Sequence, residues 1–171
     1  MDKGYIQVYT GNGKGKTTAS MGLAVRALGD GKAVFFGQFM KGHKDSAYKI
    51  LESLDNITMH LFGGKAFVGN NPKESDKIMA KEGIELSIQE LASGKYDVFI
   101  LDEINVSLMI DLITKEQFDR LIKSKPVHTE LVLTGRYAPD FVIEVADLVT
   151  EMREVKHYYN EGVIARKGIE F

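Results

Sequence analysis

Cysteine and tryptophan are both absent from this chain of 171 residues. Without cysteine the chain has no disulfide, no thiolate metal ligand and no cysteine nucleophile, and its composition fits a reducing compartment. No apolar run approaches the 18 residues of a membrane span, and the N-terminus leads into a short strand without the apolar segment of a signal peptide. We therefore expect a cytoplasmic protein without a membrane partner.

An excess of either charge is also missing. The 22 Lys and Arg residues nearly balance the 24 Asp and Glu residues, which leaves a net charge of −2. The two signs are interspersed, so there is no basic footprint for a nucleic-acid partner. The length suits one domain with a proper core, and no linker or repeat divides the chain. We expect a single domain over residues 1–171.

The most informative stretch that the chain does contain is Thr-Gly-Asn-Gly-Lys-Gly-Lys-Thr-Thr at residues 10–18. It follows an apolar run and precedes a helical pattern, which is the setting of a phosphate-binding loop. Backbone N–H groups, the positive end of the helix and a Lys ammonium would converge on a polyphosphate there. The predicted binding residues are Gly11, Asn12, Gly13, Lys14, Gly15, Lys16, Thr17 and Thr18. Thr17 can also place its hydroxyl on a bound magnesium ion.

The loop departs from the usual phosphate-loop consensus at one position. Thr10 stands where the first glycine of G-x-x-x-x-G-K-[ST] is expected. The backbone of the loop must therefore be shaped by Gly11 and Gly13 instead.

Apolar strands alternate with helical patterns along the rest of the chain. The strands are expected at residues 5–9, 33–39, 57–61, 96–103, 130–134 and 148–155. The helices are expected at 17–28, 47–54, from a cap at Asn71 through Pro72 and a capping-box Glu74 to Gly94, from Thr114 to before Pro126, and at 139–146. This order predicts an α/β domain with a mostly parallel sheet and helices on both faces.

The strand at 96–103 is expected to end in Asp102 and Glu103, a Walker-B pattern that delivers carboxylates to the carboxyl edge of the sheet. These acids are candidate ligands for Mg²⁺. The acids and the loop together are a much stronger signal for a nucleotide site than either motif alone. Arg136 ends another strand, and its guanidinium could bind phosphate oxygens there. Arg26, in the first helix, could contact a nucleotide or simply cover the core. The four His residues show no metal-ligand spacing.

With these motifs the chain resembles the P-loop type of ATP:corrinoid adenosyltransferases, also called cob(I)alamin adenosyltransferases. The resemblance runs in order over nearly the whole chain: residues 9–19 with Thr10 in the loop, 25–27, 38–42, 101–103, 134–136 and the C-terminal run 146–171. It implies a P-loop NTPase-like domain, ATP as co-substrate, Mg²⁺ or Mn²⁺ as cofactor and a corrinoid as substrate. It also implies a flavin-type reductase as a partner, and a homodimer.

The resemblance implies that Co(I) of a reduced corrinoid attacks C5′ of ATP and expels the whole triphosphate. Lys16 and Arg136 would act on the leaving group, and residues 11–18 would bind it. Thr17 with Glu103 or Asp102 would hold the magnesium ion, and Arg26 would reach the sugar side of the nucleotide.

A Phe-x-Trp element presses on the lower face of the corrin in better-known members of that family, and this chain has no Trp. Phe67, with Phe62, is the candidate replacement for this apolar wedge.

Two other functions remain open on the residues alone. A small-molecule kinase or ATPase would use Asp102 to orient an acceptor and would form ADP. An ATP-responsive binding protein without turnover would form no product, and its loop at 62–71 would become ordered on nucleotide binding and expose a surface for a partner.

Overall fold

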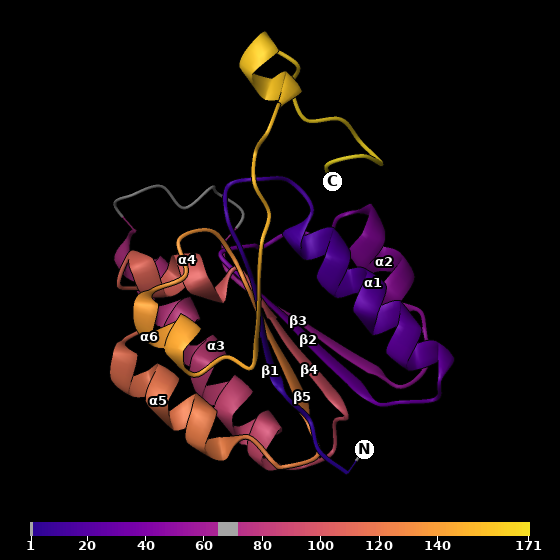
Figure 1. Cartoon of the computed structure of the whole chain (residues 1–171), viewed down its shortest axis with the longest axis vertical. Coiled ribbons are helices and arrows are strands. Elements are labelled where there is room, and N and C mark those ends of the chain that lie inside the picture. The colour runs from indigo at the N-terminus through magenta and orange to yellow at the C-terminus, as the bar shows by residue number, and fades with distance from the viewer. Residues whose placement is uncertain (1, 65–71) are drawn as a thin grey trace.

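A six-stranded parallel sheet forms the centre of the computed structural model, which describes residues 2–64 and 72–171 (Figure 1). Its strands are β1 (Ile6–Thr10), β2 (Val34–Phe39), β3 (Ile57–Phe62), β4 (Val98–Asp102), β5 (Glu130–Thr134) and β6 (Leu148–Glu151). They lie in the order β3-β2-β4-β5-β1-β6, and every pairing is parallel. The predicted parallel α/β fold is therefore confirmed.

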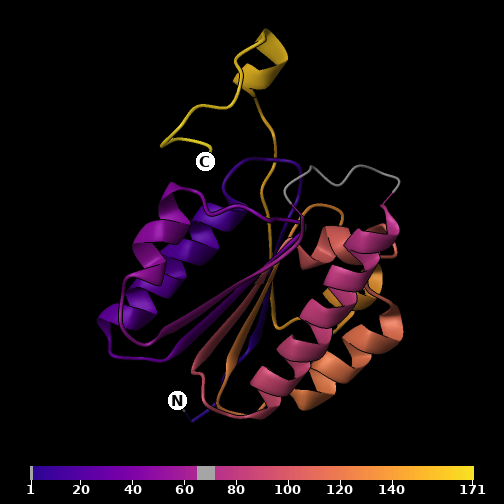
Figure 2. The ribbon, with the colours of Figure 1, turned by 180° about the vertical axis from the view of Figure 1, so that it is seen from behind.

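Helices cover both faces of this sheet. They are α1 (Lys16–Gly29), α2 (Ser46–Glu52), α3 (Glu74–Ala92), α4 (Ile104–Met109), α5 (Lys115–Ser124) and α6 (Asp140–Glu144). Helices α1 and α2 lie on one face, and α3 to α6 lie on the other (Figures 1 and 2). No helix among the described residues is long and apolar enough to cross a membrane.

The alternation of side chains along the strands divides the core into two clusters. In β4, Phe99 and Leu101 point into the larger cluster, under α3 to α6, whereas Val98 and Ile100 point into the cluster under α1. All residues of β2 and β4 are buried, which explains their nearly continuous apolar sequences. The same period of two sends the last residue of β4, Asp102, to the face of α1.

Most expected boundaries differ from the structure by one or two residues, and three differences concern the site or the elements that lead to it. The strand expected at 96–103 ends at Asp102, and Glu103 precedes the short helix α4, which the sequence pattern did not predict. Helix α3 begins at Glu74 after Lys73, and the carboxylate of Asp76, not Glu74, accepts the N–H of Lys73 at 2.9 Å. The expected cap Asn71 lies outside the described residues.

The third difference concerns the last strand, which ends at Glu151 rather than at residue 155. From there the chain leaves the sheet and runs above its carboxyl edge to a 3₁₀ turn, η1 (Tyr158–Glu161), and the C-terminus (Figure 1). Met152 still touches the phosphate loop, because its N–H donates to the Thr10 carbonyl at 2.9 Å and its carbonyl accepts the N–H of Gly13 at 2.6 Å. These two bonds fix the start of the C-terminal segment beside residues 10–13.

Candidate functional site

The phosphate loop connects β1 to α1, as its sequence predicts. Gly11 has a φ of +92° and Gly15 a φ of +118°, a backbone region that favours glycine. Gly13 is required for a different reason, since a Cβ there would lie 2.6 Å from the Met152 carbonyl oxygen. The expectation that Gly11 and Gly13 shape the loop is confirmed. The Thr10 hydroxyl accepts the N–H of Ala138 at 3.2 Å, which ties the loop to the segment after β5.

Lys16 is the buried cation of the loop. Only 6% of the residue is exposed, and its ammonium donates to the carbonyls of Gly11 and Gly13 at 2.7 Å each. Burial lowers the pKa of Lys16, while the nearby carboxylates of Glu103 and Asp102 partly oppose that shift. Lys16 is therefore held at the centre of the loop among charged groups of both signs.

Asp102 lies at the carboxyl end of β4, against the start of α1. The Thr17 hydroxyl donates to both of its carboxylate oxygens, at 3.0 and 3.1 Å. Because that hydroxyl hydrogen points to Asp102, the lone pairs of the Thr17 oxygen are free to face a cation. Sequence reasoning placed Thr17 and Asp102 at one metal site, and the structure brings them into contact.

Glu103 occupies a strained position at the N-terminus of α4, with a φ of +60°. Burial and the neighbouring Asp102 carboxylate raise its pKa to about 7, although Lys16, Arg136 and Lys41 act in the opposite direction. A carboxyl group in a cleft whose pKa is raised by burial and by a neighbouring carboxylate is typical of functional sites.

Arg136 follows Gly135, which has a φ of +133°, at the end of β5. The residue is exposed and lines the same pocket as the loop and Glu103. A Cβ on Gly135 would lie 3.1 Å from the Cβ of Asn105, so this turn passes close to α4. The predicted position of Arg136 at the site is confirmed.

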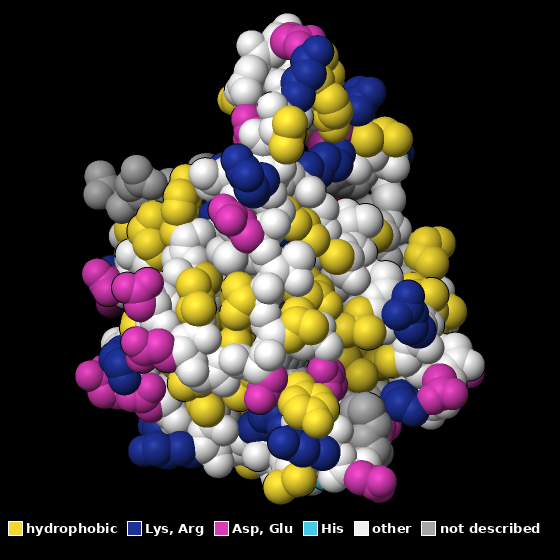
Figure 3. Space-filling model, in the orientation of Figure 1, with side chains coloured by type: hydrophobic (Ala, Val, Ile, Leu, Met, Phe, Trp, Pro, Cys, Tyr) yellow, Lys and Arg dark blue, Asp and Glu magenta, His cyan; other side chains and the backbone are white. Residues whose placement is uncertain are grey.

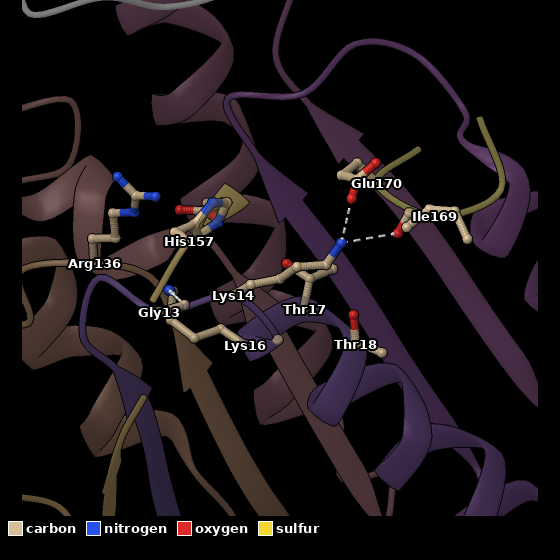
Figure 4. A pocket seen from close by; sticks show the side chains of 11 residues that line it. Gly13, Lys14, Lys16, Thr17, Thr18, Arg136, His157, Ile169 and Glu170 are labelled. Carbon is tan, nitrogen blue, oxygen red and sulfur yellow. Dashed lines mark hydrogen bonds and ion pairs between the residues drawn. The ribbon is translucent and has the colours of Figure 1, made fainter. Parts of the chain in front are cut away.

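A cavity of about 360 Å³ lies on the phosphate loop (Figure 4). Besides Glu103 and Arg136 it is lined by Gly13, Lys14, Gly15, Lys16, Thr17, Thr18, His157, Ile169 and Glu170. Figure 4 shows Lys14 reaching the C-terminal segment, where its ammonium pairs with the Glu170 carboxylate at 2.6 Å and donates to the Ile169 carbonyl at 3.4 Å. Lys14 and Arg166 hold the pKa of Glu170 far below its usual value, together with the Tyr158 hydroxyl.

Some predicted site residues lie apart from this cavity. Arg26 is exposed in the last turn of α1, ten residues after Lys16, which corresponds to about 15 Å along the helix. Asn12 is exposed at the tip of the loop and does not line the cavity. Phe62 is 8% exposed, packs against Phe39 with ring centroids 5.0 Å apart, and lines a second cavity of about 210 Å³ beside α3. Phe67 lies outside the described residues.

The donor set suits Mg²⁺ bound through a polyphosphate. No three His, Cys, Asp or Glu side chains of residues 2–64 and 72–171 gather into a metal site by themselves. Thr17, Asp102 and Glu103 instead offer a few hard oxygen atoms beside a phosphate loop, and Mg²⁺ commonly completes such sites with phosphate oxygens and water. The residues therefore fit the cofactor that the sequence predicts.

The sequence analysis assigned no role to several residues of the site. Gln38 donates its side-chain N–H to Asp102 at 3.0 Å and was recognisable as a polar residue in an otherwise apolar strand. Thr134 donates to Asp102 at 2.6 Å. No local sequence pattern predicts that His157, Ile169 and Glu170 line the cavity. The contact between Lys14 and Glu170, for example, joins residues 156 positions apart.

Comparison with known proteins agrees with this geometry. The family described as ATP:corrinoid adenosyltransferase BtuR/CobO/CobP matches residues 2–171. A corrinoid adenosyltransferase of Escherichia coli K12 is 33% identical over 170 residues, which cover 99% of this chain and 87% of the relative. One from a Sinorhizobium species is 36% identical over 174 residues, with 99% and 81% covered. The Pseudomonas aeruginosa protein is 32% identical over 172 residues, with 99% and 85% covered. The chain belongs to the BtuR/CobO/CobP family of ATP:corrinoid adenosyltransferases.

Proposed function

We propose that this protein transfers the 5′-deoxyadenosyl group of ATP to the Co(I) centre of a corrinoid and releases triphosphate. The observation that carries the proposal is a phosphate-loop pocket lined by Lys16, Arg136 and Glu103 in a member of this family. The Asp102 carboxylate lies directly behind this lining, bonded to the Thr17 hydroxyl. In the reaction the cobalt electron pair forms a bond to C5′, and the C5′–O bond breaks. The electron pair of the broken bond stays on the triphosphate, which the phosphate loop would bind.

Stabilisation of the leaving group is the task of the protein in this mechanism. Negative charge grows on the triphosphate as the C5′–O bond breaks, so cations placed beside it lower the barrier. Lys16 is held in the loop by two carbonyls and could exchange them for phosphate oxygens. Arg136 projects from the end of β5 as an exposed guanidinium at the same pocket and would bind phosphate oxygens bidentately.

Mg²⁺, or Mn²⁺ in its place, would be held by Thr17 and by Asp102 or Glu103 together with the triphosphate. When bound, the ion would neutralise part of the charge on the phosphate oxygens. Asp102 keeps the Thr17 hydroxyl turned so that its lone pairs face outward. Glu103 would supply a second carboxylate at the rim of the pocket.

Contacts of Phe62 and Phe67 with the corrin, and of Arg26 with the nucleotide sugar, stay predictions from the sequence. We further propose that a separate flavin-type reductase supplies the electron that converts Co(II) to Co(I). Because the reductant acts on the corrinoid, this protein needs no redox group of its own.

We also propose that the protein is a homodimer. Strand β6 is the last strand at one edge of the sheet, and Leu148 and Val149 on it are 46% and 43% exposed. Figure 3, in the orientation of Figure 1, shows hydrophobic side chains in the middle of the face that is turned to the viewer. An exposed strand edge offers unpaired N–H and C=O groups to a second chain, and an exposed apolar patch marks an interaction site. Sedimentation equilibrium should give twice the chain mass of 19.1 kDa, and a monomer at all concentrations contradicts the proposal.

Phosphorus NMR identifies the product and so tests the proposed reaction. With ATP, Mg²⁺ and chemically reduced cobalamin, free triphosphate supports adenosyl transfer, ADP supports a kinase or ATPase, and unchanged ATP supports a binding protein without turnover. We expect triphosphate.

Two arginine variants locate the reaction at the pocket. Arg136→Ala should reduce kcat/KM by about 10²-fold, the usual loss when one group that stabilises charge is removed. Arg120→Ala is the matched control, because Arg120 is paired with Glu85 between α5 and α3 and neither residue lines the pocket. Its activity should equal that of the wild type.

A further inference from the structure

Asp102 is held by both strands that flank β4. Gln38, its Cα partner on β2, donates from Nε2 to Asp102 Oδ2 at 3.0 Å. Thr134, at the end of β5, donates from its hydroxyl to Asp102 Oδ1 at 2.6 Å. Each oxygen of the carboxylate thus receives a bond from a different neighbour in the sheet, in addition to the bond from Thr17. The orientation of the carboxylate is fixed on both sides.

Thr134 also acts on the second candidate metal carboxylate. Its oxygen accepts the backbone N–H of Glu103 at 3.2 Å, while its hydrogen is donated to Asp102. Glu103 adopts a φ of +60°, so this bond helps to hold a backbone conformation that is unfavourable for a residue with a side chain. One fully buried hydroxyl therefore connects Asp102 to the start of α4.

Gln38 is an unusual residue for its place in the fold. It is 0% exposed in a strand whose other residues are apolar or glycine, and its Oε1 has no hydrogen-bond partner among the described residues. A buried polar atom without a partner is costly, so packing alone does not account for an amide at this position. The hydrogen bond that its side chain donates to Asp102 is a reason for an amide at this position.

From these contacts we propose that Gln38 and Thr134 are positioning residues, which set the affinity of the site for Mg²⁺·ATP by orienting Asp102 and, through it, the Thr17 hydroxyl. The inference rests on the proposed function, since it concerns the metal-nucleotide site of that reaction. If the carboxylate rotates, the Thr17 hydrogen loses its acceptor and turns, and a lone pair no longer faces the cation. Neither Gln38 nor Thr134 touches the cation or the triphosphate in this account.

The test is calorimetric titration of the full-length protein with ATP, with and without Mg²⁺. Thr134→Val removes the hydroxyl at nearly constant shape, and Thr134→Ser restores it. We expect the valine variant to lose about 10- to 100-fold in Mg²⁺·ATP affinity, the usual effect of removing a group that orients a metal ligand. ATP affinity without Mg²⁺ should change less than two-fold, and the serine variant should recover most of the loss. Gln38→Met, which keeps the length of the side chain but not its donor, should act in the same direction.

Thr129→Val is the matched control. Thr129 is 1% exposed, lies just before the opposite end of β5, and donates its hydroxyl to the Tyr96 carbonyl at 2.8 Å. Loss of this hydroxyl should lower the thermal stability, as the loss of a buried hydrogen bond does, but leave Mg²⁺·ATP affinity unchanged. Equal affinity of wild type and Thr134→Val, or an equal loss with and without Mg²⁺, overturns the inference while the proposed reaction stands. If the wild type binds ATP no better with Mg²⁺, both the inference and the metal assignment of the proposed function fail.

Discussion

Individual glycines of the phosphate loop are required by geometry, whereas others in the same region are not. Gly11 has a positive φ, and a Cβ there would lie 2.5 Å from the Met152 carbonyl oxygen. Gly22, in the middle of α1, is exposed, and a Cβ there would meet nothing within 4 Å. The same substitution should therefore have opposite effects at the two positions.

We expect Gly11→Ala to lower the free energy of unfolding by about 1–3 kcal/mol through backbone strain and the close approach to Met152. It should also weaken ATP binding, because the loop must shift. Gly22→Ala should raise the stability by about 0.5–1 kcal/mol, since alanine is the better helix former. Urea unfolding of both variants measures the two effects, and a stabilised Gly11→Ala variant would show that the loop tolerates a side chain.

At the residue scale the sequence predicted the groups that belong to one local motif and missed those that the sheet brings together. Lys16 and Thr17 follow from the spacing of the loop, and Asp102 follows from the apolar strand before it. Gln38 and Thr134 reach Asp102 only because β2 and β5 are the neighbours of β4. No single segment of the sequence determines the order of the strands in the sheet. The contacts of Gln38 and Thr134 with Asp102 could therefore not be predicted from local sequence patterns.

The junction of β4 and α4 shows the same limit at the scale of elements. An apolar run followed by two acids predicted a strand through Glu103, but the chain turns there into a six-residue helix. Helix α4 is too short for a clear helical period, and most of it is buried between other elements, so apolar residues mark it no better than they mark a strand. The capping box of Thr114 and Gln117, by contrast, was a complete local signal and is confirmed.

This junction should make the stability depend on pH. The pKa of Glu103 is about 7 in the folded protein against 4.5 as its ordinary value. Between these two pH values the unfolded chain has released the proton that the folded chain retains, so the free energy of unfolding falls as pH rises and levels off above pH 7. The total contribution is at most about 3 kcal/mol.

Glu103→Gln should remove this part of the pH dependence, because the glutamine cannot ionise. The variant should gain stability over the wild type between pH 5 and pH 8, as measured by urea unfolding at several pH values. If the stability difference between the two proteins is the same at all these pH values, Glu103 does not titrate as the structure indicates.

At the scale of the whole molecule, the C-terminal segment completes the wall of the phosphate-loop pocket. Lys14 in the loop is paired with Glu170, and Glu170 also accepts hydrogen bonds from Tyr158 and Arg166. A carboxylate in that place repels a triphosphate and competes with it for Lys14. We therefore expect the segment to weaken the binding of triphosphate and to favour its release.

Glu170→Gln should raise the affinity for inorganic triphosphate by about two- to five-fold, the range of a partly exposed ion pair. The gain should shrink in high salt. In a Lys14→Gln background it should be smaller, because only the repulsion by the Glu170 carboxylate is then removed. Titration calorimetry with inorganic triphosphate measures it. A lower affinity of Glu170→Gln would instead mean that Glu170 holds the pocket in its binding shape.

The central claim is that the phosphate loop holds a leaving triphosphate rather than a phosphoryl group in transfer. The most direct test counts both products of one reaction, with triphosphate measured by phosphorus NMR and the cobalt–carbon bond by the absorbance of the adenosylated corrinoid. We expect one triphosphate for each cobalt–carbon bond formed and no ADP. Release of ADP or of single phosphates in step with the reaction, or triphosphate without an adenosylated corrinoid, would contradict it.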